Sequence, residues 1–298
     1  MRAKFKDDLI FNLIVMILLT IFLLSVAYPL YFIIIASFSD PSLVGSGQVV
    51  LYPRGFTLEA YKKVLEYKAI WIGYRNTTIY TVFFTFLSLF MTMTAGYGLS
   101  RKNIPGKGII MGYMTFTMFF NGGLIPTYLL MRSIRLEGNP IIIILMGSVS
   151  VYNIIITRTF LQSNIPDELF EAATMDGCNH FRFFGTIVLP LSPAIIAVMV
   201  LFAAVSQWNS WFNAMIYLRN QNQMPLQLIL RNIIVSSQAF LREMQMDTIS
   251  NDDIARTTLL AESMKYAVII VATLPVMIMY PFIQNYFIKG VMIGSIKG

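Results

Sequence analysis

Six long apolar runs constrain the fold of this 298-residue chain more than any other feature. A membrane-spanning helix needs about 20 consecutive, mostly apolar residues. The runs lie at residues 9–38, 76–99, 109–131, 140–160, 191–218 and 266–288. Charged residues make up only 12% of the chain, whereas a soluble domain carries roughly 25%. We therefore expect an all-α integral membrane protein.

Two of these runs carry polar residues. The fourth becomes polar around Thr157 and Arg158, and the fifth contains the stretch SQWNSWFNA. The first run is too long for the core of a signal peptide, and no small-residue cleavage site follows it. We expect the first run to be a retained span.

Basic residues in short loops predict the orientation of the chain. Arg2, Lys4 and Lys6 precede the first run, and the loop SRKNIPGKG carries Arg101 and Lys102. Short basic loops stay in the cytoplasm. If every run spans, both segments share that side with residues 164–190 and with the C-terminal tail. The N- and C-termini are therefore expected in the cytoplasm.

Two longer segments, residues 39–75 and 219–264, then face outside. In the first, Phe56-Thr57 before Glu59 is typical of a helix start. In the second, Leu226, Ile229 and residues 230, 233 and 234 place apolar side chains at helical spacing. This helix packs on the membrane surface or bundle, or it is a platform for an external partner.

Several chemistries are missing from the sequence. The central parts of the apolar runs contain no ionisable residue, which argues against an ion-coupled carrier. The sequence has no phosphate-binding loop of the G-x-x-x-x-G-K-[ST] type and no G-x-S-x-G nucleophile motif. The net charge of +7 is attributed to orientation rather than to nucleic-acid binding. A non-enzymatic membrane protein is expected.

The single cysteine and the single histidine are Cys178 and His180. One cysteine excludes an internal disulfide, and one Cys with one His does not make a metal site. Packing or chance is the simpler account of both residues.

The stretch from Pro166 to Gly177 predicts a short helix of about ten residues. Pro166 suits a first helical turn, and Asp167 and Glu168 place negative charge at the positive end of the helix dipole. Gly177 is a typical helix stop. A second helical run, residues 180–189, should end before Pro190. Physical chemistry alone leaves two interpretations: a solvated linker, or a docking element for a cytoplasmic partner.

The apolar residues of this short helix fall in two pairs, Leu169-Phe170 and Ala172-Ala173. The small alanine side chains are expected to let another surface approach closely.

Residues 171–190 resemble the EAA motif of the permease subunits of binding-protein-dependent ABC importers. The chain has Glu171-Ala172-Ala173, then Gly177 after three residues, Ile187 after nine more, and Leu189-Pro190. Further stretches are similar to the carbohydrate branch of that family: RNTTIYT, AGYGLSR, NGGLIPTYLLMRSIRL, QWNSWFNAMIYL, PLQLILR and NYFIKGVMIGSIKG.

The resemblance implies the six-helix transmembrane domain of a type I importer. Residues 1–75 would form the first span and an extracytoplasmic loop. Residues 76–290 would form the permease core, with a coupling loop at 164–190, and residues 291–298 a cytoplasmic tail. The implied function is carbohydrate import, of an oligosaccharide, driven by ATP hydrolysis in separate subunits. The alternatives are a permease for a non-sugar solute, or a secondary carrier.

The resemblance also implies the partners. These are a second, homologous permease, two copies of a cytoplasmic ATPase, and an extracytoplasmic sugar-binding protein, all at a bacterial cell membrane. No cofactor is expected in this chain, because ATP and Mg²⁺ would bind to the ATPase. No nucleic acid, metal or catalytic residue is expected.

Three sets of residues are the candidate sites. The resemblance implies that the coupling helix touches the ATPase through Glu171, Ala172, Ala173, Met175, Asp176 and Gly177. It also implies that the tail reaches between the ATPase subunits through Gly294 and Lys297, unless the tail is simply a frayed end. For the sugar path the candidates are polar and aromatic groups at membrane depth, or else parts of an interface belt: Asn121, Trp208, Asn209, Trp211 and Asn213.

Overall fold

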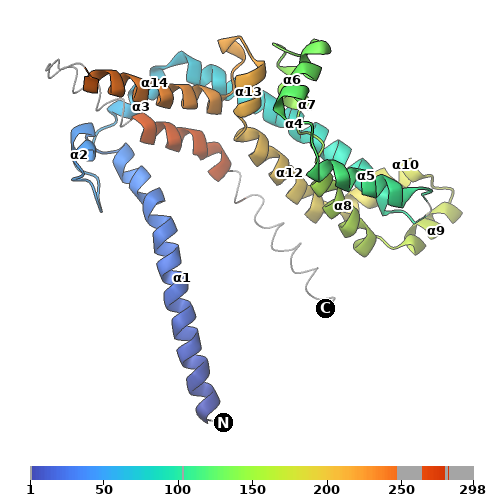
Figure 1. Cartoon of the computed structure of the whole chain (residues 1–298). Helices are drawn as coiled ribbons and strands as arrows, with labels where there is room; N and C mark the ends of the chain where they lie inside the picture. Colours follow the sequence, from blue (N-terminus) through green and yellow to red (C-terminus); the bar gives the residue numbers. More distant parts are fainter. Residues whose placement is uncertain (1, 103, 247–263, 279–280, 282–298) are drawn as a thin grey trace. The chain divides into compact units, whose positions relative to one another are not determined.

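The computed structural model describes residues 2–102, 104–246, 264–278 and 281 of the chain, without side-chain detail for 2–8 and 237–246 (Figure 1). Every regular element among these residues is helical, so the all-α prediction is confirmed. Packing divides the chain into two compact units. One comprises residues up to Lys68 and Leu230–Leu274, and the other includes Ala69–Ile229.

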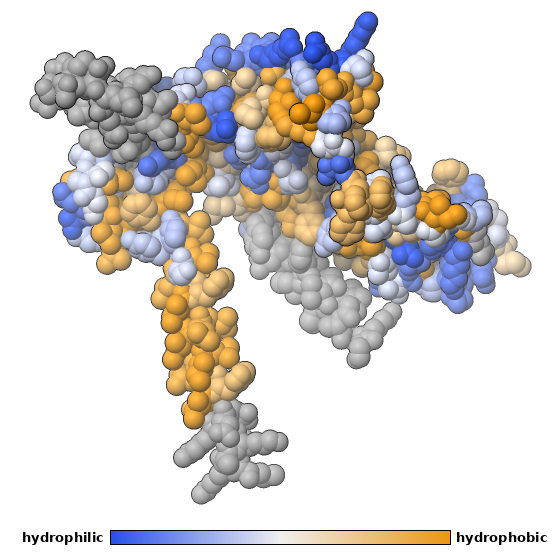
Figure 2. Space-filling view, in the orientation of Figure 1, coloured by the Kyte–Doolittle hydropathy of each residue, from blue (hydrophilic) through white to orange (hydrophobic). Residues whose placement is uncertain are grey.

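The first unit contains the long apolar helix α1 (Arg2–Ser37). Its side chains from Leu9 to Leu30 are almost all exposed, and Figure 2 shows an apolar surface along the helix. A helix that is apolar on every side belongs in lipid. The predicted first span is therefore present as one continuous helix.

Two short helices follow α1. Helix α2 (Pro41–Gly45) is capped by Asp40, whose carboxylate accepts a hydrogen bond from the Ser42 N–H. Helix α3 (Glu59–Glu66) begins close to the predicted start, and the Thr57 hydroxyl accepts the Glu59 N–H at 3.2 Å.

The second unit is built around α4 (Lys68–Ser100), a 33-residue helix that contains the predicted second span. The other helices that begin in this unit are α5 (Lys107–Phe119), α6 (Leu124–Ser133), α7 (Ile141–Leu145), α8 (Val151–Asn164), α9 (Asp167–Met175), α10 (His180–Phe183), η1 (Phe184–Val188), α11 (Leu189–Leu191), α12 (Pro193–Trp208), α13 (Phe212–Tyr217), η2 (Gln221–Gln223) and α14 (Leu226–Met246).

The predicted third span, residues 109–131, is not one straight helix. The chain bends by 110° between α5 and α6. Gly123 has a φ of 80°, which a glycine adopts readily, and its N–H donates to the Asn121 side chain at 3.0 Å. The backbone N–H of Gly123 therefore finds a partner outside the helix. Because such a turn is available, apolar composition alone does not keep residues 109–131 in one straight helix.

The fourth and fifth runs are also interrupted. Gly147, with a φ of 80°, separates α7 from α8, and α12 ends at Trp208 before the short α13 begins. The second helical run does not stop before Pro190, because η1 and α11 carry it through that residue. It then bends by 85° into α12.

Among the described residues, two helices are long and apolar enough to cross a membrane, or up to four if each bent pair is one span. The two continuous helices are Leu9–Ser37 and Lys68–Ser100. Of the predicted sixth run, the helix Met264–Ile278 is described, and most of the remainder lies outside the described residues.

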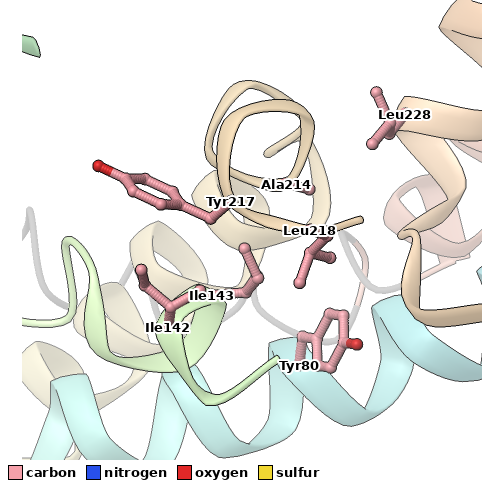
Figure 3. Packing of buried hydrophobic residues seen from close by; sticks show 7 residues of the cluster. All are labelled: Tyr80, Ile142, Ile143, Ala214, Tyr217, Leu218 and Leu228. Atoms are coloured by element: carbon pink, nitrogen blue, oxygen red, sulfur yellow. The ribbon is translucent and has the colours of Figure 1, made fainter. Parts of the chain in front are cut away.

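The N-terminal half of α4 contributes to an apolar cluster, and side-chain hydrogen bonds lie beside that cluster. In Figure 3 the Tyr80 ring rises from α4 toward Leu218 and Ile143. The Tyr80 hydroxyl donates to the Gln223 carbonyl at 2.9 Å, and the Asn76 amide donates to the Asn222 carbonyl at 2.8 Å. Residues 217–226 are therefore held at this end of α4.

The C-terminal half of α4 approaches α8 closely at Gly96. A Cβ atom at Gly96 would lie 2.7 Å from Thr157 Cγ2 and 3.3 Å from the Arg158 backbone N. Only a residue without a side chain allows this separation, so Gly96 determines how closely the two helices pack.

We expect Gly96→Ala to push α4 and α8 apart and to destabilise the chain by about 1–3 kcal/mol, as overpacking does. Gly98→Ala is the matched control, because a Cβ at Gly98 meets nothing within 4 Å and alanine favours a helix by up to about 1 kcal/mol. Thermal unfolding in detergent measures both. Equal melting temperatures for the two variants would contradict the close-approach argument.

Candidate functional site

The candidate coupling helix α9 begins and ends as its sequence predicts. Pro166 is its N-cap residue, and Asp167 and Glu168 occupy the first turn. At the other end Gly177 has a φ of 76°. Its N–H donates to the Thr174 carbonyl at 2.9 Å, and the Cys178 N–H donates to Ala173 at 3.0 Å. These two bonds form the usual glycine-terminated end of a helix.

The inner face of α9 is held by aromatic contacts. The Phe170 ring stacks on His180, with centroids 4.4 Å apart, and meets Phe183 edge-on at 5.0 Å. The His180 Nδ1 atom lies 3.2 Å from the Tyr97 hydroxyl. The single histidine therefore has a packing role, in which it joins α9 to the last turns of α4.

An ion pair fastens the first residue of α9 to the end of α4. Arg101 Nη1 lies 3.3 Å from Asp167 Oδ1, and Lys102 Nζ lies 3.0 Å from Asp167 Oδ2. The Arg101 side chain is only 9% exposed and lies over the rings of Tyr97 and Phe183. The hydrogen bond to Asp167 raises the pKa of Lys102, so Lys102 remains charged beside the carboxylate.

The backbone carbonyls at the end of α4 are also satisfied by side chains. The Leu99 carbonyl accepts from Arg158 Nε at 3.2 Å, and the Ser100 carbonyl accepts from Gln162 Nε2 at 3.1 Å. The last carbonyls of a helix have no partner within it, and basic groups there also offset the helix dipole. As a result, the end of α4 is fastened to α8 as well as to α9.

The outer face of α9 is free of such contacts within the described residues. Glu168, Glu171 and Ala172 are exposed there, and Met175 is 89% exposed. Beyond the helix, Phe181 is also 89% exposed. A surface that combines acids with fully exposed apolar side chains is typical of a protein contact.

A hollow of about 440 Å³ lies between α9 and the end of α4. Its walls come from the ion pair and from the helix itself, and the residues include Arg101, Lys102, Asp167, Glu171, Met175 and His180. The lining combines charged and apolar side chains, so the hollow can receive a side chain from a docked protein.

The two alanines of the motif have different roles. Ala173 packs inward on the buried cluster of Tyr97, Leu161 and Phe183, whereas Ala172 faces outward. The sequence interpretation placed both on one close-approach face. Asp176 is the exposed C-cap residue of α9.

The structure places the predicted sugar-path residues in different surroundings. Trp208 is 6% exposed, and its ring lies 6.2 Å from Tyr74. The Asn209 amide donates to the Val205 carbonyl of its own helix at 2.9 Å. Trp211 is half-buried against the cluster of Figure 3. Asn213 is partly buried, Asn121 lies in the bend before α6, and Gly294 and Lys297 fall outside the described residues.

Sequence reasoning missed the fastening of α9 by Arg101, Lys102 and Tyr97. The two basic residues were noted for orientation alone. Their loop and the acidic start of α9 are 66 residues apart at Arg101 and Asp167, so only the opposite signs of charge could have suggested the pairing.

Comparison with known proteins identifies the protein family of this chain. No protein-family model matches it. It is 37% identical over 299 residues to the polygalacturonan/rhamnogalacturonan transport system permease protein YtcP of Bacillus subtilis (strain 168), covering all of both chains. It is 24% identical to the diacetylchitobiose uptake system permease protein DasC of Streptomyces coelicolor (strain ATCC BAA-471 / A3(2) / M145), covering 92% of this chain and 93% of that one.

A solved structure is also similar: a chain of a bacterial ABC transporter involved in the import of the acidic polysaccharide alginate. The TM-score is 0.82 at 35% identity, over 94% of this chain and 98% of the other. The bilayer-length helices are those of a membrane protein, and the relatives are named as permease proteins of transport systems, so the chain is a transport subunit rather than an enzyme. The chain belongs to the permease proteins of ABC importers, and as such works with partner components.

We expect Phe170→Ala to loosen α9 by about 1–3 kcal/mol, because two aromatic pairs worth roughly 0.5–1.5 kcal/mol each are lost. Hydrogen exchange over residues 167–175 should accelerate accordingly. Leu169→Ala is the matched control, since Leu169 is 37% exposed on the same helix. Unchanged exchange in the Phe170 variant would show that the aromatic contacts do not hold α9.

Proposed function

We propose that this permease carries an oligosaccharide into a bacterial cell, together with a second permease, two ATPase subunits and a sugar-binding protein outside the membrane. The relatives named above act on polygalacturonan or rhamnogalacturonan, on diacetylchitobiose and on alginate. All of these are carbohydrates, which supports a sugar as the cargo. Import of a non-sugar solute is the alternative.

One observation carries the mechanism: the inner face of α9 is bonded to the rest of the unit, while its outer face is exposed. Asp167 pairs with Arg101 at the end of α4, Phe170 stacks on His180 of α10, and Glu171 and Met175 are exposed. We propose that this face docks on the ATPase and that the α9 end of the chain lies in the cytoplasm with both termini. The basic loop around Arg101 supports this orientation.

Coupling then follows from the attachment of α9. ATP and Mg²⁺ bind to the ATPase, because this sequence has no phosphate-binding loop. When the ATPase dimer closes, it moves α9. The Arg101–Asp167 pair passes the movement to α4, and the bundle changes from inward-open to outward-open. ATP thereby shifts the population toward the state to which it binds better. The tail around Gly294 and Lys297 would be a second contact with the ATPase.

We expect Glu171→Lys and Gly177→Pro to leave assembly largely intact but to uncouple ATP hydrolysis from uptake. The first reverses a charge on the docking face. The second forbids the left-handed φ of 76° and removes the N–H bonded to Thr174. The measurement is sugar uptake and ATPase activity of the complete transporter in proteoliposomes.

Glu66→Lys in α3 is the matched control, because it makes the same exposed charge change in the other compact unit. It should leave the ratio of uptake to ATP hydrolysis unchanged. Normal uptake by both α9 variants would rule out the docking role.

Asn209→Ala is a better test than Trp208→Ala of which residues line the proposed sugar path. Asn209 is exposed, whereas Trp208 is buried against Tyr74, so its removal would damage packing. We expect Asn209→Ala to raise the KM for uptake several-fold with unchanged thermal stability, since about one hydrogen bond to the sugar is lost. An unchanged KM would remove Asn209 from the path.

A further inference from the structure

Three arginines lie at the end of the second unit opposite to α9. Arg132 lies in the last turn of α6, Arg135 follows that helix, and Arg219 follows α13. The side chains of Arg132 and Arg219 are 65% and 77% exposed. The Gly138 N–H donates to the Tyr217 carbonyl at 2.9 Å, so the two segments lie side by side. We call Arg132, Arg135, Glu137 and Arg219 the basic rim.

A single carboxylate organises the basic rim. Glu137 is 15% exposed and accepts a hydrogen bond from the Tyr128 hydroxyl at 2.8 Å. Arg219 Nη2 lies 2.5 Å from Oε1 of Glu137, and Arg132 Nε lies 3.8 Å from Oε2. The hydrogen bonds from Tyr128 and Arg219 hold the pKa of Glu137 below its usual range. Glu137 therefore stays ionised and keeps both guanidinium groups in place.

The basic rim retains positive charge and free donors. Three arginines against one glutamate leave a formal charge of +2. Each guanidinium has five N–H donors in a planar fork, and Glu137 engages only part of those on Arg132 and Arg219. Exposed forks of this kind bind carboxylates through two parallel hydrogen bonds.

Orientation does not account for these charges. In the proposed orientation the basic rim faces outside, where short loops carry few Lys and Arg. Arg135 has a φ of 58° because it ends α6 as Gly177 ends α9: its N–H donates to the Arg132 carbonyl at 3.1 Å, and the Leu136 N–H donates to the Met131 carbonyl at 3.0 Å. The helix end therefore fixes the backbone conformation of Arg135, and only the charges call for a further explanation.

The groups beside the basic rim suit a sugar. The rings of Tyr128 and Tyr217 stack with centroids 5.9 Å apart. Side-chain amides are exposed at Asn220, Gln221 and Asn222. Amides pair with sugar hydroxyls, while guanidinium groups add an affinity for carboxylates that a neutral sugar would not use.

We infer that the basic rim binds the carboxylates of an acidic oligosaccharide as it enters the transporter. The inference rests on the proposed function, both for the sugar cargo and for the side of the membrane. Positive charge at the entrance also raises the local concentration of an anionic ligand and speeds its arrival. An acidic face of the binding protein is the competing occupant, and the experiment distinguishes the two.

The test uses the complete transporter in cells that carry its own partner proteins, with Arg132→Gln/Arg219→Gln as the variant. The probes are radiolabelled tri-galacturonate and a neutral oligosaccharide that the wild type imports. We expect uptake of subsaturating tri-galacturonate to fall about tenfold or more, as expected for loss of charged hydrogen bonds. Uptake of the neutral sugar should stay within twofold.

The controls separate charge from structure. Arg54→Gln removes an exposed arginine in the other compact unit. It should change the uptake of neither tri-galacturonate nor the neutral oligosaccharide. Arg132→Lys/Arg219→Lys keeps the charge and should restore part of the tri-galacturonate uptake. Equal melting temperatures of the purified variants exclude a loss of folding.

Three results would overturn the inference. An equal loss with both sugars would assign the basic rim to protein docking or structure, and no loss with tri-galacturonate would leave it without a ligand role. A wild type that imports neutral sugar and no tri-galacturonate would overturn the basic-rim inference alone. By contrast, a wild type that imports no oligosaccharide of either kind would overturn the proposed function itself.

Discussion

The arrangement of the second unit depends on how the two ends of α4 are held. At the C-terminal end, Arg158 and Gln162 bond the last carbonyls, and Arg101 pairs with Asp167. The Arg101 side chain is nearly buried, so breaking this pair would leave a charge without its counterion in a site of low polarity. Such losses are larger than those at exposed ion pairs. The proposed transmission of an α9 movement depends on this pair.

The opposite end of α4 is held by neutral groups. The side chains of Asn76, Thr77 and Tyr80 bond the backbone of residues 222–226. From Asn76 to Tyr97 the helix rises roughly 30 Å, which matches the apolar thickness of a bilayer. One helix thus carries the α9 site at its C-terminal end and residues 222–226 at its N-terminal end.

The distribution of charge follows from the same constraint. The two helices of spanning length, Leu9–Ser37 and Lys68–Ser100, keep ionisable groups out of their central turns, so acids and bases gather beyond their ends. At one end they fasten α9 and leave its outer face for a partner. At the other end Glu137 organises arginines whose remaining donors face solvent. Under the proposed function, the chemistry of the permease lies at these two surfaces.

The amino-acid sequence by itself determined the membrane class, the helical fold, the span of α4 and the start and end of α9. These depend on local properties: apolar length, the acids after Pro166, and a glycine at position 177. It also pointed to the family through the residues of the coupling loop. Only the tertiary structure decided that Ala173 packs inward while Ala172 faces outward, and that Arg101 pairs with Asp167. The tertiary structure also decided where the third run bends, because Gly123 and Asn121 stabilise a turn that apolar composition does not reveal. These features arise from contacts between distant segments or from backbone dihedral angles, and neither leaves a periodic signal in the sequence.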